Sequence, residues 1–342
     1  MPHDSPAVTA LRRIAFLLEL AQEPTYRVRA FRRAADTVSA LSEEELEQRV
    51  REGSLQQLPG IGAVTALAIT EAQRGETPIY LRRLESTEGR SIADDAAVLR
   101  KALRGDCHTH SDWSDGGSGI LEMAEAARSL GHEYIALTDH SPRLTVANGL
   151  SAERLRRQID EIARLNAGLA PFRILTGIEV DINEDGSLDQ EDGLLERLDI
   201  VVASVHSKLR MPREQMTERM LKAVANPRTS VLGHCTGRIV AGRGRPESEF
   251  DPEAVFEACR RFGVAVEINS RPERLDPPKR LLRLAVEAGC RFAIDTDAHA
   301  PGQLGWQIRG CERAAACGVS AESIINTLNA TDLTVRADGN PG

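Results

Sequence analysis

Six histidines and three carboxylates of this sequence have the types and spacing that could bind metal ions. The stretch 106–116, DCHTHSDWSDG, holds His108 and His110 one residue apart among three aspartates. Further along the chain, histidines and acidic residues end or directly follow short apolar runs. Imidazole nitrogens and carboxylate oxygens are ligands for Zn²⁺, Mn²⁺ or Fe²⁺. The candidate ligands are His108, His110, Asp115, His140, Glu179, His206, His234, Asp297 and His299.

The size of this set bears on the kind of site. Of the eight histidines in the chain, only His3 and His132 fall outside the pattern. Any one of the others could be an ordinary core or surface residue, but six together with three carboxylates favour a metal centre. Nine ligands are too many for one ion, so the set predicts two or three ions.

Parallel strands are the elements that would bring these residues together, and they are predicted from about residue 102 onward. Short apolar runs alternate there with amphipathic segments, as in strands connected by helices. Asp251, Pro252 and Gly263 mark the start and end of one such helix. Seven repeats predict a closed or nearly closed α/β barrel, in which the carboxyl ends of the strands share one face. The runs are LRGDCH, YIALTDH, FRILTGIE, DIVVASVH, SVLGH, VAVEIN and RFAIDTDAH, of which the first and fifth are the weakest as strands.

The N-terminal part of the chain follows a different pattern. Residues 7–85 show only helical periodicity and contain LPGIG at 58–62, a tight glycine turn between two helical segments. We therefore predict a small helical domain at 1–85, a linker with a short helix at 86–101, the barrel at 102–331 and a disordered tail at 332–342.

Composition limits the class of protein. A chain of 342 residues with 41% hydrophobic and 27% charged residues is typical of two globular domains. No apolar run is long enough to span a membrane and no signal peptide opens the sequence, so we expect a cytoplasmic protein. The six cysteines form no C-x-x-C pair and are expected to be reduced and mostly buried.

The charge distribution leaves two interpretations open. A net charge of −8 argues against a protein that coats nucleic acid. Residues 11–33, however, hold six arginines against two glutamates, a local charge of +4 that is compatible with contact to a phosphate backbone. From charge alone, an ordinary solvated helix face explains this segment better.

The motifs together resemble the polymerase and histidinol phosphatase (PHP) family. The order H-x-H, T-D-H, an isolated glutamate, two isolated histidines and a final D-x-H is the signature of that family, and the resemblance spans about 102–330. TDHSPRLTVANGL, GIEVDI, ASVHS, GHCTGR and EINSRPERLD are more closely similar to the PHP domain of bacterial family X DNA polymerases. Residues 7–85, with YRVRAFRRAA and LPGIG, resemble the first domain of the same polymerases. The resemblance implies a distorted (β/α)7 barrel preceded by a small all-α helix-hairpin-helix domain.

The resemblance also implies a site with three divalent ions, Zn²⁺ or Mn²⁺, with Fe²⁺ as a further option. One ion would be held by His108, His110, Glu179 and Asp297; a second by Glu179, His206 and His234; the third by Asp115, His140 and His299. Asp139 would orient a neighbouring ligand from outside the site. Catalysis is assigned to His108, His110, Glu179, His206 and Asp297, and binding of the substrate phosphate to Arg143, Lys208, Arg238 and Arg271, each a few residues past a strand end.

Two absences narrow the activity. About 20 residues separate the two resemblances, too few for the polymerase core that family X enzymes place there, so we expect no DNA synthesis. Residues 1–100 contain no lysine, and Ala68 stands where such polymerases carry the lysine that attacks an abasic sugar. Without an amine no imine forms, so we expect no lyase activity and a binding role instead. DNA contact is assigned to Arg29, Arg32 and the turn Gly60, Ile61 and Gly62, which could instead be a plain turn between packed helices.

Three functions follow from these features. The first is a phosphoesterase at nucleic-acid 3′ ends, a 3′–5′ exonuclease or 3′-phosphatase of DNA repair. The alternative is a small-molecule phosphomonoesterase of the histidinol-phosphatase type. A DNA-end-binding adaptor with a structural metal is the third, and the large ligand set argues against it because structural sites are closed by four ligands.

Overall fold

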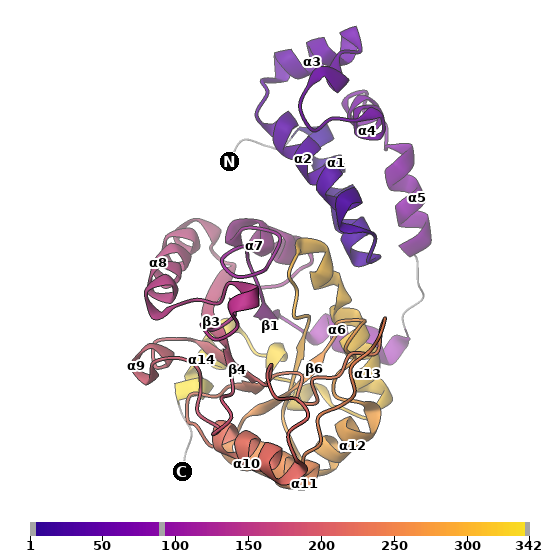
Figure 1. Ribbon diagram of the computed structural model, residues 1–342. Coiled ribbons are helices and arrows are strands. Elements are labelled where there is room, and N and C mark those ends of the chain that lie inside the picture. The colour runs from indigo at the N-terminus through magenta and orange to yellow at the C-terminus, as the bar shows by residue number, and fades with distance from the viewer. Residues whose placement is uncertain (1–4, 89–92, 339–342) are drawn as a thin grey trace. The chain divides into compact units, whose positions relative to one another are not determined.

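The structure is a computed structural model that describes residues 5–88 and 93–338 (Figure 1). The chain divides into two compact units, Met1–Ser91 and Ile92–Gly342. No helix in the described ranges is long and apolar enough to cross a membrane.

The first unit is all helical, as its periodicity predicts. Ser5 caps the first helix by accepting a hydrogen bond from Val8 N, and Ser42 caps the third by accepting one from Glu45 N. Apolar stripes at helical spacing meet in one core. The elements are α1 (Pro6–Leu20), α2 (Thr25–Ser39), α3 (Glu43–Glu52), η1 (Leu55–Gln57), α4 (Ala63–Gln73) and α5 (Ile79–Glu88).

The second unit contains the predicted barrel. Its seven-stranded sheet has the order β1 to β7 with every described pair parallel, and it closes at the carboxyl ends through a bridge between Thr109 and Ala298. The strands are β1 (Gly105–Thr109), β2 (Tyr134–Leu137), β3 (Arg173–Asp181), β4 (Ile200–Ser204), β5 (Val231–Leu232), β6 (Ala265–Asn269) and β7 (Phe292–Asp295). The fold class is confirmed, and the fifth strand is short, as expected of the SVLGH run.

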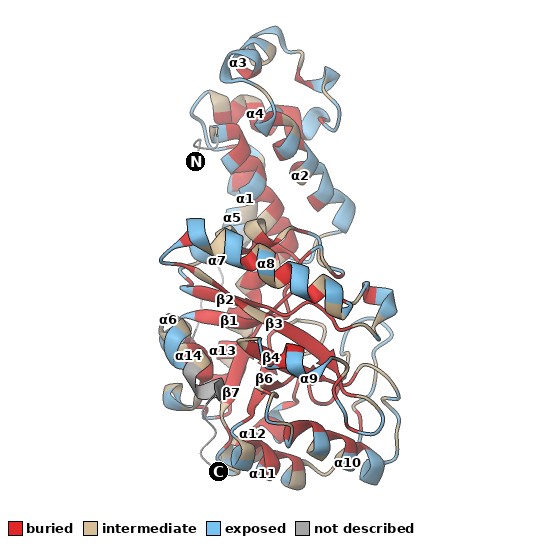
Figure 2. Cartoon of the chain, turned by 90° about the vertical axis from the view of Figure 1, so that its left-hand side faces the viewer, coloured by how far each residue is buried: buried red, intermediate tan, exposed pale blue. Residues whose placement is uncertain are grey.

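Helices surround the sheet and leave their outer faces exposed (Figure 2). The strands are almost entirely buried, which explains their near-continuous apolar runs. The helices are α6 (Asp94–Ala102), α7 (Ile120–Ser129), α8 (Ala152–Leu169), α9 (Asp192–Leu195), α10 (Arg213–Val224), α11 (Pro252–Phe262), α12 (Lys279–Glu287), α13 (Gln307–Ala316) and α14 (Ala330–Asp338). The 3₁₀ turns are η2 (Thr145–Ala147), η3 (Pro301–Trp306), η4 (Ala321–Ser323) and η5 (Ile325–Thr327).

Two segments differ from the boundaries predicted from the sequence. The short helix expected in the linker at 86–101 corresponds to α6, but α6 belongs to the second unit, where it packs on α13 and its Arg100 donates to the Leu130 carbonyl (3.2 Å). Residues 332–338, expected in a disordered tail, belong to α14, because Leu333 is buried in an apolar cluster with residues of β1, β2 and β3. Residues 1–4, which include His3, and 339–342 lie outside the described part of the chain.

Candidate metal centre

All nine candidate ligands lie at the carboxyl ends of the barrel strands. His108 belongs to β1 and Glu179 to β3, and the others follow β1, β2, β4, β5 and β7. Parallel strands direct their carboxyl ends to one face, which is why residues far apart in the sequence meet here. Most of these side chains are fully buried, whereas Asp115, with 37% of its side chain exposed, lies at the entrance.

Glu179 lies at the middle of the cluster, with its two carboxylate oxygens facing different histidines. Its Oε2 lies 3.3 Å from His108 Nε2 and 3.6 Å from His110 Nε2. Its Oε1 lies 3.2 Å from His206 Nε2 and 2.9 Å from His234 Nε2. Two ligands about 2.1 Å from one tetrahedral ion are about 3.4 Å apart, so these separations are close to those of shared ligation. The carboxylate can therefore bridge two ions.

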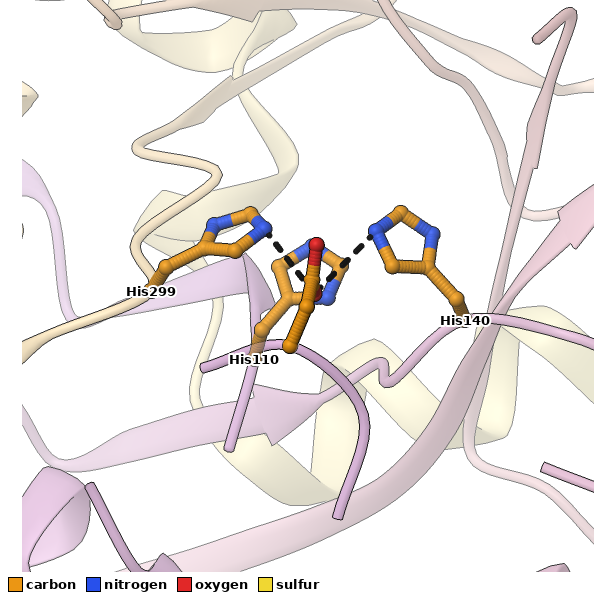
Figure 3. A group of neighbouring side chains, drawn as sticks. His110, His140 and His299 are labelled. Atoms are coloured by element: carbon orange, nitrogen blue, oxygen red, sulfur yellow. Dashed lines mark ion pairs between the residues drawn. The ribbon is translucent and has the colours of Figure 1, made fainter. Parts of the chain in front are cut away.

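Asp297 and Asp115 extend the cluster on either side. Asp297 Oδ1 lies 3.3 Å from His110 Nε2 and 4.0 Å from His108 Nε2. Asp115 Oδ1 lies 3.5 Å from His140 Nε2 and 3.3 Å from His299 Nε2, the two ion pairs dashed in Figure 3.

The ring of His110 lies against the rings of two other candidate ligands, His299 and His140. The His110 ring stacks on His299 with centroids 4.1 Å apart and lies 4.5 Å from the ring of His140. His140 Nδ1 is also 2.9 Å from Glu179 Oε2.

The grouping of ligand atoms is less sharply divided than the resemblance implies. His110 lies within reach of both the Glu179 group and the Asp115 group. His140 likewise belongs to the Asp115 group and to a group with Glu179 and His206. The nine side chains thus form one continuous cluster in which His110, His140 and Glu179 each belong to two groups of possible ligands.

Unpartnered buried nitrogens show that divalent cations fit this cluster. Within the described residues, seven imidazole nitrogens and one carboxylate oxygen of the candidate ligands are buried without a hydrogen-bond partner. Several of these atoms face a charged partner without hydrogen-bond geometry, as His140 Nδ1 does at 2.9 Å from Glu179 Oε2, and a cation placed between such atoms would satisfy both. The atoms are His108 Nε2, His110 Nδ1 and Nε2, His140 Nδ1, Glu179 Oε2, His206 Nδ1 and Nε2, and His234 Nδ1.

Electrostatics keep the central carboxylate ready to bind a cation. Burial by itself would raise the pKa of Glu179, but the surrounding imidazoles of His108, His206 and His140 hold its pKa well below the usual range. Burial would also raise the pKa of Asp297, but its neighbours, Arg271 first among them, hold that pKa well below the usual range. Both side chains are therefore ionised, the form in which a carboxylate ligates a metal.

Glu267, in β6, orients two of the candidate ligands and was missed by the sequence analysis. Its Oε1 accepts from His108 Nδ1 (2.6 Å), and its Oε2 accepts from the backbone N of His234 (2.5 Å) and from Asn269 Nδ2 (3.2 Å). In the neutral form of His108, a proton on Nδ1 leaves Nε2 with a free lone pair that faces the cluster and can ligate a cation. The available signal was a single glutamate inside the apolar run VAVEIN, since a fully buried carboxylate requires partners.

Asp139 acts less directly than expected. Its carboxylate accepts from Ser111 N (2.8 Å), Ser111 Oγ (2.6 Å), Ser114 Oγ (2.5 Å) and Gln158 Nε2 (2.6 Å). These bonds fix the loop that follows His110, so Asp139 affects that ligand through the backbone and does not hold an imidazole ring.

A cleft of about 340 Å³ opens onto the cluster and contains two arginines. The predicted Arg271 donates through Nη1 to the Asp297 carbonyl (3.1 Å) and lies 2.9 Å from His299 Nδ1. Arg274, which the sequence analysis did not single out, pairs through Nε with Asp297 Oδ2 (3.2 Å), and its buried Nη1 is without a hydrogen-bond partner among the described residues. Both guanidinium groups line the cleft beside the candidate ligands.

The other three basic side chains predicted to bind phosphate do not line this cleft in the described part of the chain. Arg238 donates to the carbonyls of Arg274 and Leu275 and to Glu247 Oε1 (3.4 Å), so its guanidinium is engaged in holding the loop after β6. Arg143 and Lys208 are exposed and are not among the described residues that line the cleft. Arg238 is likewise not among the described residues that line the cleft, so the structure does not bring this predicted residue to the candidate ligands.

In the helical unit, some of the residues predicted to bind DNA are exposed and others are buried or already bonded within the protein. Gly60 has a φ of 79°, which favours glycine, and its turn lies against α2. Ile61 is a buried core residue, and the N–H groups of Ile61 and Gly62 are bonded to Leu58 O (3.3 Å) and Thr65 Oγ1 (2.9 Å). Those two N–H groups are therefore not available to a phosphate, whereas Ala63 and Val64, the first two residues of α4, are exposed.

The two predicted arginines of α2 also differ. Arg32 forms a bidentate pair with Glu19 of α1, with Nε–Oε1 and Nη2–Oε2 both at 2.9 Å, and only 18% of its side chain is exposed. Its interhelical role contradicts the assignment to DNA. Arg29 is exposed, as is Arg33, whose Cβ lies next to the Gly60 turn.

Lysine chemistry has no place in this unit either. Ala68, at the position of the polymerase lysine, is buried in the helical core.

The six cysteines are all buried and free. Burial raises the pKa of Cys107 and Cys235, the two beside candidate ligands, well above the usual range, so their thiols are protonated and unreactive.

Comparison with known proteins matches both units to families. Residues 3–77 match a family described as a helix-hairpin-helix domain, and residues 106–271 match the PHP domain. The DNA polymerase/3′-5′ exonuclease PolX of Bacillus subtilis (strain 168) is 41% identical over 231 residues, which are 68% of this chain and 40% of PolX. The chain thus spans less than half the length of that relative.

Shorter proteins match the chain over most of their own length. A probable phosphatase of Thermoanaerobacter sp. (strain X514) is 30% identical over 233 residues, covering 65% of this chain and 89% of that protein. A crystal structure of histidinol phosphate phosphatase from Lactococcus lactis subsp. lactis Il1403, complexed with zinc, L-histidinol and phosphate, aligns with a TM-score of 0.46 and 18% identity over 70% of this chain and 95% of that one.

Proposed function

We propose that this chain, which belongs to the PHP family, hydrolyses phosphoric esters and that its substrates are nucleic-acid 3′ ends. It would act there as a 3′–5′ exonuclease or 3′-phosphatase in DNA repair. The observation that carries this proposal is one cleft that combines a metal-binding cluster with two arginines, in a chain that also has a helix-hairpin-helix domain.

The proposed metal assignment uses three divalent ions. His108, His110, Glu179 and Asp297 would hold the first, Glu179 with His206 and His234 the second, and Asp115, His140 and His299 the third. The separations between ligand atoms and the two-sided position of Glu179 support this division. Such ions, when bound, lower the pKa of water and neutralise charge on a phosphoryl group. His108, His110, Glu179, His206 and Asp297 are the proposed catalytic residues.

The side chains around the cluster have complementary tasks. Arg274 has a buried N–H without a partner in the described protein, and a phosphoryl oxygen is the acceptor that a guanidinium binds most favourably. Arg271 lies beside it and adds a second positive charge. Glu267 holds His108 in one tautomer, so that ligand needs no reorganisation when substrate arrives.

Contact with DNA is assigned to the helical unit. The exposed Arg29 and Arg33, together with Ala63 and Val64 at the exposed start of α4, support binding to a phosphate backbone. The printed name of the Bacillus relative includes 3′-5′ exonuclease, and this relative also supports an end-directed activity.

A second candidate is a phosphomonoesterase that acts on small molecules, such as histidinol phosphate. It is favoured by the match to a probable phosphatase over 89% of that protein's length and by a cleft near the lower end of the usual range for ligand pockets, roughly 300–1,000 Å³. A purely structural metal site fits less well, because Asp115 and His299 face an open cleft.

Binding and hydrolysis measured together would separate the candidates. Wild-type protein and Glu179→Gln are compared for binding to 3′-recessed DNA over a range of salt concentrations, and for hydrolysis of that DNA, p-nitrophenyl phosphate and histidinol phosphate. We expect DNA binding by both proteins that weakens steeply with salt, and hydrolysis by the wild type only. Turnover of the small esters without any binding or cleavage of DNA would favour the second candidate.

A further inference from the structure

The mouth of the metal cleft has an apolar rim. Leu144, Val146 and Ala147, from the loop after β2, line the cleft on one side, and Ile239, from the loop after β5, lines it as well. Val146 is 93% exposed and Val240, next to Ile239, is 52% exposed. Isolated exposed apolar side chains need no explanation, but the four apolar residues that line the cleft share one entrance with candidate ligands and two arginines.

Both loops of the rim are held in fixed positions relative to the metal cluster. In the first loop, Ala147 N donates to the Leu144 carbonyl (3.0 Å) and Leu150 N to the carbonyl of His140 (2.7 Å). His140 is itself a candidate ligand, so the rim begins directly at the cluster.

The second loop is equally constrained. Ile239 and Arg245 exchange two backbone hydrogen bonds, of 3.0 and 2.8 Å. Val240 N donates to the Glu273 carbonyl (2.7 Å), which ties this loop to the segment that carries Arg271 and Arg274. The apolar residue Ile239 and the two arginines of the cleft therefore lie on segments that are hydrogen-bonded to each other.

This arrangement selects a substrate with two parts. The cations and metal ligands at the base of the cleft suit a phosphoryl group, whereas aliphatic side chains at the mouth gain only from covering an apolar surface. A hydrophilic polyol phosphate offers no such surface. A nucleotide does, because every base has a flat apolar face next to its sugar and phosphate.

We propose that Leu144, Val146 and Ile239 form a subsite for the base of the 3′-terminal nucleotide, so that the protein prefers 3′ ends that carry a base over abasic ends. The subsite rests on the proposed action at nucleic-acid 3′ ends and adds its specificity. Because only the face of the base is contacted, the preference extends to all four bases.

The test compares kcat/KM for two oligonucleotides that differ only in the last residue, a normal nucleotide or a tetrahydrofuran abasic analogue. Wild-type protein should prefer the base-bearing end by about tenfold, or about 1.4 kcal/mol. Val146→Asn and the double variant Val146→Asn/Ile239→Asn should reduce this ratio towards one. Val98→Asn is the matched control, because Val98 is a similarly exposed valine (66%) on α6 and does not line the cleft.

The possible failures are distinguishable. Equal cleavage of both ends by the wild type, or an equal loss on both ends in the variants, would overturn the base subsite while leaving the 3′-end function in place. If neither oligonucleotide is cleaved but p-nitrophenyl phosphate is, the 3′-end function fails and the subsite fails with it. A changed ratio in Val98→Asn would also count against the subsite.

Discussion

Replacing Glu267 by glutamine tests whether the cluster depends on an oriented His108. Three donors converge on this fully buried carboxylate, from His108 Nδ1, the backbone of His234 and Asn269 Nδ2. Glutamine has the same shape, but one of its two terminal atoms is an NH₂ group that cannot accept. Whichever way the amide turns, either His108 or His234 meets a donor in place of an acceptor.

The size of the effect follows from the bond that is lost. A hydrogen bond to a charged group contributes about 1.5–3 kcal/mol, and comparable changes behind a metal-ligating histidine reduce metal affinity or activity about 10–100-fold. We therefore expect Glu267→Gln to lose metal to a chelator at concentrations that spare the wild type, and kcat/KM for p-nitrophenyl phosphate to fall by about 10–100-fold.

The assay combines metal analysis with kinetics and a matched control. Metal content is measured by mass spectrometry after dialysis against graded chelator, and circular dichroism verifies that each variant is folded. Glu71→Gln is the control, because Glu71 is also a buried glutamate that accepts one backbone hydrogen bond, from Ile79 N (3.0 Å), but it belongs to the helical unit. A folded Glu267→Gln protein with wild-type metal content and kcat/KM would refute the role of Glu267.

Three further predictions follow from particular contacts. Arg274→Gln should raise the inhibition constant for inorganic phosphate by about tenfold, since the guanidinium is assigned to the phosphoryl group; an unchanged constant would remove Arg274 from that role. Arg32→Ala should lower the unfolding free energy of the helical unit by roughly 2–3 kcal/mol in urea titrations because it removes the bidentate pair with Glu19, whereas the exposed Arg29→Ala should change it by less than about 0.5 kcal/mol; equal effects would contradict this difference. Burial and the charge of Arg100 lower the pKa of His132 to about 3 in the folded protein. Between pH 6.5 and about 3, only the unfolded chain therefore binds a proton at His132, and the stability of the folded protein falls as the pH falls. His132→Gln should therefore lose less stability than the wild type between pH 6.5 and 5, by about 2 kcal/mol, and identical pH profiles would show that His132 titrates normally.

The metal cluster was predictable because the fold converts sequence position into spatial proximity. Once a run such as YIALTDH is recognised as a parallel strand, its final histidine is directed to the face where every other strand of the barrel also ends. His140 and His299 could therefore be placed together although 159 positions separate them in the sequence. The helical unit was predictable for a similar reason, because its apolar stripes and serine caps act within one or two turns.

Side-chain pairing across elements was not predictable from spacing. Arg32 and Arg29 look alike in the sequence, yet only Arg32 faces the carboxylate of Glu19 on the neighbouring helix. Arg238 and Arg274 both follow strand ends, but backbone carbonyls use the donors of Arg238, while one N–H of Arg274 stays without a partner in the described protein.

The order of elements, the barrel and the set of nine candidate ligands are properties of the linear sequence, because hydrophobic periodicity and parallel topology are enough to determine which residues reach one face. Which arginines pair within the fold and which line the cleft, and the link from Glu267 to His108, were decided only by the tertiary structure. A hydrogen bond depends on distances of a few tenths of an ångström between groups far apart along the chain, and no local pattern encodes such a distance.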